Sequence, residues 1–104
     1  MANDIDDRTI QKIKDWTAQF PAQLERAEKL VHRNRIFINR VAGIGVIDSN
    51  KALQLGLTGP CLRGSGIARD LRRDMPYLIY DQLDFNVITY NEGDCWARYM
   101  VRIQ

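Results

Sequence analysis

The apolar positions near the start of the chain follow a helical period. From about Asp6 onward, apolar residues recur at steps of three and four, which places them on one face of a helix. These positions are Ile10, Ile13, Trp16, Phe20, Leu24, Ala27 and Val31. Pro21 has no backbone N–H and crowds the preceding turn, so the pattern also predicts a kink or a break near residues 17–21.

A second helical pattern lies at the other end of the chain. Asp94 is a suitable N-cap, and an apolar stripe at i, i+3, i+4 and i+7 follows it. The stripe consists of Trp96, Tyr99, Met100 and Ile103. We expect Arg98 and Arg102 to face the other way. No stop signal precedes Gln104, so we expect the chain to be an internal fragment of a longer protein.

Between these helices the pattern predicts strands. Residues 36–47 are apolar and rich in β-branched side chains, which predicts one bent strand or two short ones, with a bulge or a close backbone approach at Gly43 and Gly45. Residues 85–90 alternate as a half-buried strand does. A short helix over residues 49–55 should end at Gly56.

These elements predict an α+β fold in one domain, residues 1–104, with residues 1–4 as a tail. A kinked N-terminal helix would pack on a small, mostly antiparallel sheet. The short helix and the C-terminal helix would complete the domain.

Residues 57–77 read as neither helix nor strand, and a loop of this length is often functional. The residues that we single out in it are Arg63, Gly64, Ser65, Gly66, Asp70, Arg72 and Arg73. One interpretation is a solvated turn whose ion pairs contribute about 0–1 kcal/mol each. The other is a structural brace or subunit interface, in which guanidinium groups hold carboxylates or carbonyls. Composition favours neither.

Charge and motif spacing exclude several kinds of site. The net charge of +2 comes from interleaved acidic and basic residues, which argues against a nucleic-acid partner. Cys61 and Cys95 lack the paired spacing of metal or disulfide frameworks. Ser65 lacks the flanking glycines of a nucleophile elbow, and Asp48 stands where a dinucleotide fingerprint needs its third glycine. We therefore predict no catalytic, cofactor-binding or metal-binding residue.

The central segment and the last helix contain a series of motifs in a fixed order. They are residues 58–67 and 70–74, Pro76-Tyr77, Tyr80-Asp81, Phe85, Gly93-Asp94-Cys95, Ala97-Arg98-Tyr99 and Val101-Arg102. The segment before them adds Phe20-Pro21, Leu24, residues 34–36 and residues 43–46. Over roughly residues 15–104, this series resembles one family, the D-type subunit of the proton-translocating NADH:quinone oxidoreductase (respiratory complex I).

The resemblance implies a fold like that of the nickel–iron hydrogenase large subunit and a part in forming the quinone-reduction site. The parent complex would couple electron transfer from NADH to quinone with proton translocation. The family's quinone-contacting His and Tyr lie upstream of this sequence, so the fragment itself would be structural and the loop from Arg63 to Asp74 a brace. The fragment would hold no cofactor. FMN and the iron–sulfur clusters would belong to other subunits.

The implied partners are other complex I subunits, above all the neighbouring iron–sulfur-cluster subunit, and the isolated fragment is expected to self-associate. The implied location is peripheral, on the cytoplasmic face of a bacterial inner membrane or the matrix face of an organellar one. Two alternatives stay open. One is a fragment of a large subunit related to membrane-bound nickel–iron hydrogenases. The other is a non-enzymatic module whose basic loop binds an acidic partner or nucleic acid.

Overall fold

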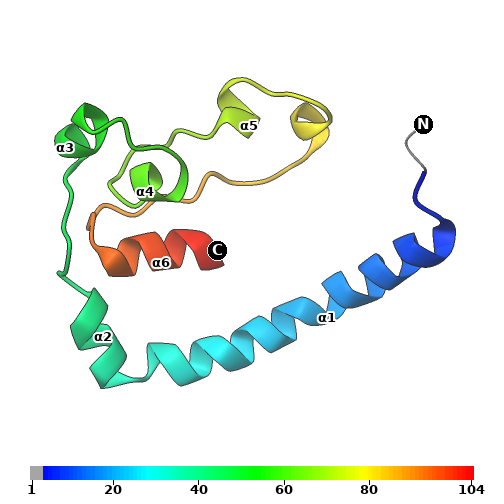
Figure 1. The fold of residues 1–104 in the computed structure, drawn as a ribbon, viewed down its shortest axis with the longest axis horizontal. Coiled ribbons are helices and arrows are strands. Elements are labelled where there is room, and N and C mark those ends of the chain that lie inside the picture. Colours follow the sequence, from blue (N-terminus) through cyan, green and yellow to red (C-terminus); the bar gives the residue numbers. More distant parts are fainter. Residues whose placement is uncertain (1–3) are drawn as a thin grey trace. The chain divides into compact units, whose positions relative to one another are not determined.

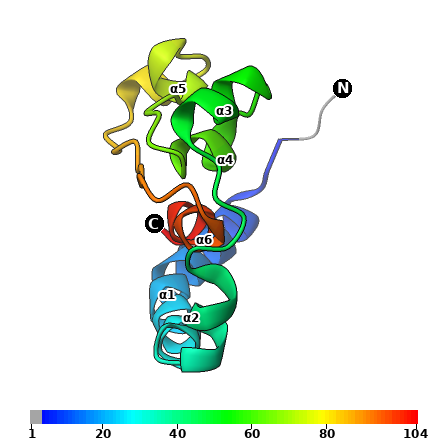
Figure 2. The same cartoon turned by 90° about the vertical axis from the view of Figure 1, so that its left-hand side faces the viewer.

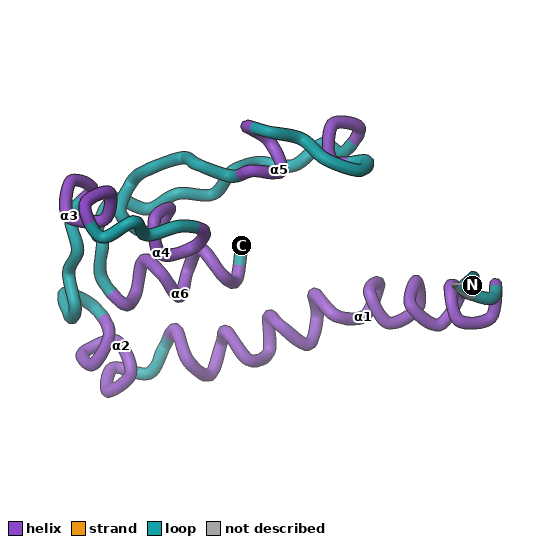
Figure 3. The backbone as a smooth tube through the Cα atoms, turned by 45° about the horizontal axis from the view of Figure 1, so that its top comes forward, coloured by secondary structure: helices purple, strands orange, loops and turns teal. Residues whose placement is uncertain are grey.

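The computed structural model of the chain describes residues 4–104, and the predicted tail lies almost wholly outside them. The described residues form helices, turns and extended segments without any strand (Figure 3). The small sheet of the predicted α+β fold is therefore wrong. The chain divides into two compact units, Met1–Phe37 and Ile38–Gln104.

The first unit is built on α1, Asp7–His32, a helix of 26 residues. Asp6 caps it by accepting a hydrogen bond of 2.8 Å from the Thr9 N–H. The helix continues through Pro21, so the predicted break is wrong (Figure 1). Proline removes only one donor, and a long helix retains its other hydrogen bonds. The predicted kink at this position remains a prediction.

Helix α2, Arg35–Val41, occupies the first half of the predicted strand 36–47. The Asn34 side chain explains the difference, because its Oδ1 accepts hydrogen bonds from the N–H groups of Ile36 at 2.9 Å and Phe37 at 3.3 Å. This cap satisfies donors that a first helical turn leaves free, and it outweighs the modest β preference of Ile and Val. The close backbone approach is real: the Cys95 N–H donates to the Ile44 carbonyl at 3.0 Å.

The predicted short helix is confirmed as α3, Ser49–Gln54, with Asp48 as its N-cap. Gly56 follows it at φ +65°, a conformation that favours glycine. The predicted loop contains two short helices, α4, Gly59–Arg63, and α5, Leu71–Asp74, so its description as neither helix nor strand is wrong there. A 3₁₀ turn, η1, covers Tyr80–Gln82.

The second predicted strand, residues 85–90, is also absent from the described residues. Residues 35–41 of its predicted partner are helical, residues 42–47 are turns or irregular backbone, and the two segments form no ladder. The backbone is satisfied beside α4 instead: the Tyr90 N–H donates to the Arg63 carbonyl at 3.0 Å, and the Gly93 N–H to the Gly64 carbonyl at 2.9 Å. Tertiary hydrogen bonds thus replace the sheet.

The core of the Ile38–Gln104 unit lies where α4 packs against α3 and α6 (Figure 2). Helix α6, Cys95–Ile103, begins after Asp94 as predicted. Its buried residues are Ala97 and Val101, which meet the core with Leu62 and Ala52. The predicted apolar stripe from Trp96 to Ile103 is only half-buried. The fully buried side chains of α3 and α6 are the small residues Ala52 and Ala97, and the larger side chains from Trp96 to Ile103 are only partly covered.

Candidate functional site

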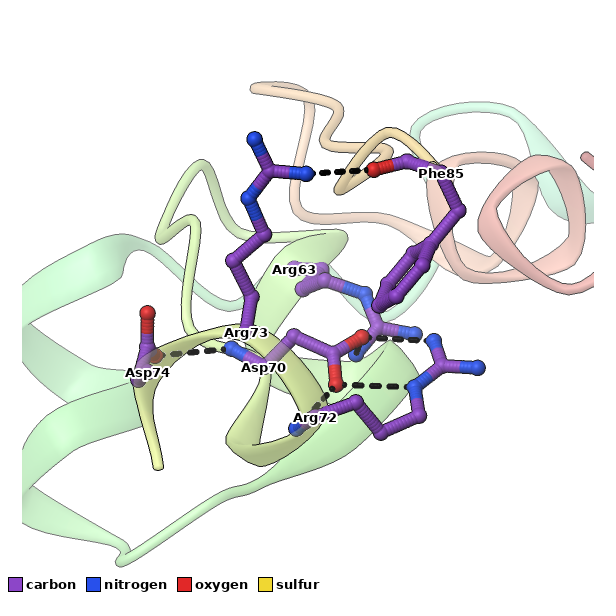
Figure 4. Close-up of polar contacts among 6 residues, drawn as sticks. All are labelled: Arg63, Asp70, Arg72, Arg73, Asp74 and Phe85. Carbon is purple, nitrogen blue, oxygen red and sulfur yellow. Dashed lines mark hydrogen bonds and ion pairs between the residues drawn. The ribbon is translucent and has the colours of Figure 1, made fainter. Parts of the chain in front are cut away.

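Asp70 is the centre of a group of charged residues at the start of α5. Its Oδ1 accepts hydrogen bonds from the Arg72 N–H at 3.1 Å and Arg72 Nε at 2.9 Å, and its Oδ2 accepts one from Arg72 Nη2 at 2.6 Å. Arg63 Nη1 lies 3.3 Å from the same Oδ2 (Figure 4). The Asp70 side chain is only 6% exposed, so these contacts replace its lost hydration.

This environment holds Asp70 in its charged form. The hydrogen bond from Arg72 lowers the pKa of Asp70 to about 2, and the charge of Arg63 adds to the effect, while burial opposes it. The same contact raises the pKa of Arg72. A carboxylate with so low a pKa is a poor proton carrier near neutral pH. The charged Asp70 carboxylate is suited to lasting ion pairs and hydrogen bonds with its arginine neighbours.

Further contacts tie α5 to residues 80–85. Arg73 Nη1 donates to the Phe85 carbonyl at 2.7 Å. The Arg72 guanidinium lies 4.9 Å from the ring centre of Phe85 and 5.9 Å from that of Tyr80, within the range of cation–π attraction. The structure thus brings together Arg63, Asp70, Arg72 and Arg73, which we call the arginine brace.

Gly64, Ser65 and Gly66 lie outside the arginine brace. They contact other segments of the chain, at Ile47, Asn91 and Arg98. The Ser65 hydroxyl donates to the Ile47 carbonyl at 2.8 Å and is buried. A Cβ on Gly64 would lie 3.0 Å from the Arg98 Cγ, and one on Gly66 would lie 2.8 Å from the Asn91 Oδ1. These positions need small residues because other segments approach them closely.

The sequence pattern did not reveal the contacts made by Asp94 and Arg98. Besides capping α6, Asp94 accepts a hydrogen bond from the Gly43 N–H at 2.7 Å through its Oδ2. Arg98 donates to the carbonyls of Gly93 at 2.6 Å and Gly45 at 2.9 Å. The helical pattern predicts that Arg98 faces away from the fold, and this prediction is wrong, because the side chain binds two backbone carbonyls of the fold. Of these contacts, only the capping of α6 by Asp94 could be predicted from neighbouring residues in the sequence.

A hollow lies beside the arginine brace, with a volume of about 340 Å³. Its lining residues are Thr58, Gly59, Leu62, Arg63, Arg69, Asp70 and Leu71. Within residues 4–104, no group of three His, Cys, Asp or Glu side chains is placed to hold a metal ion. Both cysteines are free thiols. None of the helices within residues 4–104 combines the length and the apolar character that crossing a bilayer requires.

The fold of this chain is similar to that of a subunit of a solved respiratory membrane complex. The solved structure of the membrane-bound sulfane sulfur reductase, an archaeal respiratory membrane complex, superposes with a TM-score of 0.90 at 36% identity, covering 99% of this chain and 28% of that one. The chain belongs to the family of the respiratory-chain NADH dehydrogenase 49 kDa subunit, whose family model matches residues 1–104. The family assignment from the sequence motifs is thereby confirmed.

Curated relatives agree with this assignment. A D-type subunit of the NADH-quinone oxidoreductase of Rhizobium etli is 51% identical over 100 residues, which are 96% of this chain and 25% of the relative. The D-type subunit of Salinibacter ruber is 47% identical over 103 residues, 99% of this chain and 23% of the relative. The chain therefore spans about a quarter of the length of the relatives that it matches.

Proposed function

We propose that the chain supplies part of the D-type subunit of an NADH-quinone oxidoreductase and helps to form its quinone-reduction site. The parent complex would pass electrons from NADH to quinone and couple this transfer to proton translocation. The observation that carries the proposal is the match of nearly the whole chain, at 51% identity, to a protein named as this subunit.

Within that complex, the segment has a structural role. Asp70 remains ionised, Arg72 is paired with it, and the Ser65 hydroxyl is bonded to a backbone carbonyl, so these groups brace the fold or a subunit interface. Quinone, NADH, FMN and the iron–sulfur clusters would be held by other parts of the complex. The nearest partner would be the neighbouring iron–sulfur-cluster subunit, on the cytoplasmic face of a bacterial membrane or the matrix face of an organellar one.

A hydrogenase-related parent is the second candidate. The likeness to the sulfane sulfur reductase complex, at a TM-score of 0.90, supports the view that this segment can serve complexes with different substrates. Sequence identity favours the quinone-linked parent, at 51% against 36% for the sulfur reductase chain. The segment would then have the same structural role in both kinds of complex, and other parts of each complex would determine its substrate.

A chimeric subunit tests the proposal. The 100 matching residues of the Rhizobium etli protein would be replaced by this sequence in cells that lack the native subunit. We expect the membranes to reduce quinone with NADH. NADH-dependent ferricyanide reduction, which needs no quinone, reports separately on NADH oxidation. A chimera that accumulates in the membrane without quinone reduction would contradict the proposal.

A matched control is a chimera carrying Gly93→Val. Gly93 has φ +65°, and any Cβ there meets the Ile47 carbonyl. This variant should lose both the subunit and quinone reduction, because a steric conflict with backbone cannot be relieved by side-chain rotation.

A further inference from the structure

The hollow beside the arginine brace combines apolar walls with cations. Leu71 supplies an exposed apolar side chain, Leu62 lies beneath it with only 1% of its surface exposed, and Arg63 and Arg69 supply guanidinium groups. Leu71 is 54% exposed although it lines this hollow. The volume of about 340 Å³ lies at the lower end of the range for sites that enclose a bound group.

The charges around the hollow do not balance. Asp70 is engaged by Arg72, and Arg63 shares the same carboxylate at 3.3 Å. The Arg69 side chain makes no hydrogen bond or ion pair with any residue from 4 to 104. The residues that line the hollow therefore include two guanidinium groups, those of Arg63 and Arg69, and one carboxylate, that of Asp70. The Arg63 side chain is only 12% exposed, and a desolvated cation is stabilised by an added counter-charge.

We infer that this hollow receives a segment from the remaining polypeptide of the subunit, one that carries an apolar side chain beside an Asp or Glu. The apolar side chain would lie against Leu71, which is 54% exposed. The carboxylate would pair with Arg63 and Arg69, whose planar guanidinium groups suit two-point contact with a carboxylate.

The inference rests on the proposed function, because it takes the occupant from the longer subunit. The curated relatives are about four times as long as this chain, since the match spans 25% of the Rhizobium etli protein. That additional polypeptide is the nearest source of a covering segment. The exposed Leu71 side chain argues against a small hydrated anion, which would gain nothing from contact with it.

Photo-crosslinking in the active chimera tests the inference. A benzophenone amino acid would replace Leu71, and the control would carry it at Leu53, which is 56% exposed in α3 and does not line the hollow. We expect the Leu71 probe to capture one peptide of the same subunit, with an acidic residue next to an apolar one. The Leu53 probe should not capture that peptide. Mass spectrometry identifies the product.

Charge reversal gives a second readout. Arg69→Glu should lower the yield of the Leu71 crosslink about tenfold, because it places like charges together at the contact. Arg40→Glu changes an exposed arginine in α2 and should leave the yield unchanged. Equal yields in the two variants would overturn the electrostatic part of the inference.

The outcomes separate the inference from the proposed function. A chimera that reduces quinone but gives no crosslink, or a crosslink to lipid or to another subunit, overturns the inference and leaves the function standing. Loss of quinone reduction in the unmodified chimera counts against the function instead. If the Leu71 probe impairs assembly, the same probe at Thr58, an exposed and uncharged position that also lines the hollow, gives the answer.

Discussion

At the residue scale, the Asp70 side chain connects α5 to α4. Its carboxylate caps α5 through the Arg72 N–H, binds the Arg72 side chain and lies 3.3 Å from Arg63 in α4. For the charged residues of this segment the sequence left a solvated turn and a structural brace or subunit interface equally open. Burial of the carboxylate to 6% exposure favours the brace, because an exposed ion pair contributes little.

The low pKa of Asp70 makes a prediction about acid stability. The pKa is about 2 in the folded chain against an ordinary value of 3.8, so the folded state favours the ionised form. This contribution is complete above the ordinary value and is lost as the pH falls from about 4 toward 2. Asp70→Asn should lower the free energy of unfolding by about 2 kcal/mol at pH 7 and flatten its fall with acid.

Urea unfolding at pH 7 and pH 3 measures this effect, with Asp84→Asn as the control. Asp84 is exposed and should change the free energy of unfolding by less than about 0.5 kcal/mol at pH 7. If Asp70→Asn and Asp84→Asn proved equally stable at pH 7, the assigned role of the Asp70 carboxylate would be refuted.

At the element scale, predictions based on local capping succeeded and predictions based on β preference failed. Helices α3 and α6 begin where Asp48 and Asp94 cap them. The first half of the strand predicted at residues 36–47 lies in α2, because the Asn34 side chain caps a helix there. A strand needs a partner, and no local signal says whether one will be available.

The junction between Ile47 and Gly93 replaces the predicted sheet contact and gives the second prediction. Gly93 and Gly56 both have φ +65°, but a Cβ on Gly93 meets the Ile47 backbone, whereas nothing lies within 4 Å of one on Gly56. Gly56→Ala should cost about 1–2 kcal/mol for its left-handed backbone alone. Gly93→Ala should cost about 3 kcal/mol or more, because backbone must also move.

Thermal unfolding of both variants, monitored by circular dichroism, compares these costs. The difference between the two melting temperatures isolates the steric term, since the backbone conformation is shared. Equal melting temperatures would mean that the close approach of Gly93 to Ile47 is not a constraint on the fold.

At the scale of the whole molecule, much apolar surface remains exposed. Helix α1 has no buried residue, and its Ile13 and Trp16 are 50% and 57% exposed. In the second unit, Met75, Leu78 and Ile79 are exposed to 69%, 85% and 59%. Apolar area on this scale is characteristic of surfaces that other polypeptide covers. The chain on its own should therefore associate with itself.

Sedimentation of the purified chain over a range of concentrations tests this third prediction. Replacing Ile13 and Trp16 with Gln should raise the dissociation constant about tenfold or more, since each large apolar side chain contributes about 1.5–3 kcal/mol when buried. Lys14→Gln is the control and should have little effect. A monomer at every concentration would rule the prediction out.

The helices that follow the caps Asp6, Asp48 and Asp94, and the family, could be predicted from the order of the residues. These features depend on a cap or a motif within a few residues, so their signals are local. The hydrogen bonds from the Gly43 N–H to Asp94, 51 residues away, and from Arg98 to the Gly45 carbonyl, 53 residues away, became visible only in the folded chain. Such contacts form only when the intervening chain folds back and brings the two residues together. The spacing of residues along the sequence does not show that this will happen.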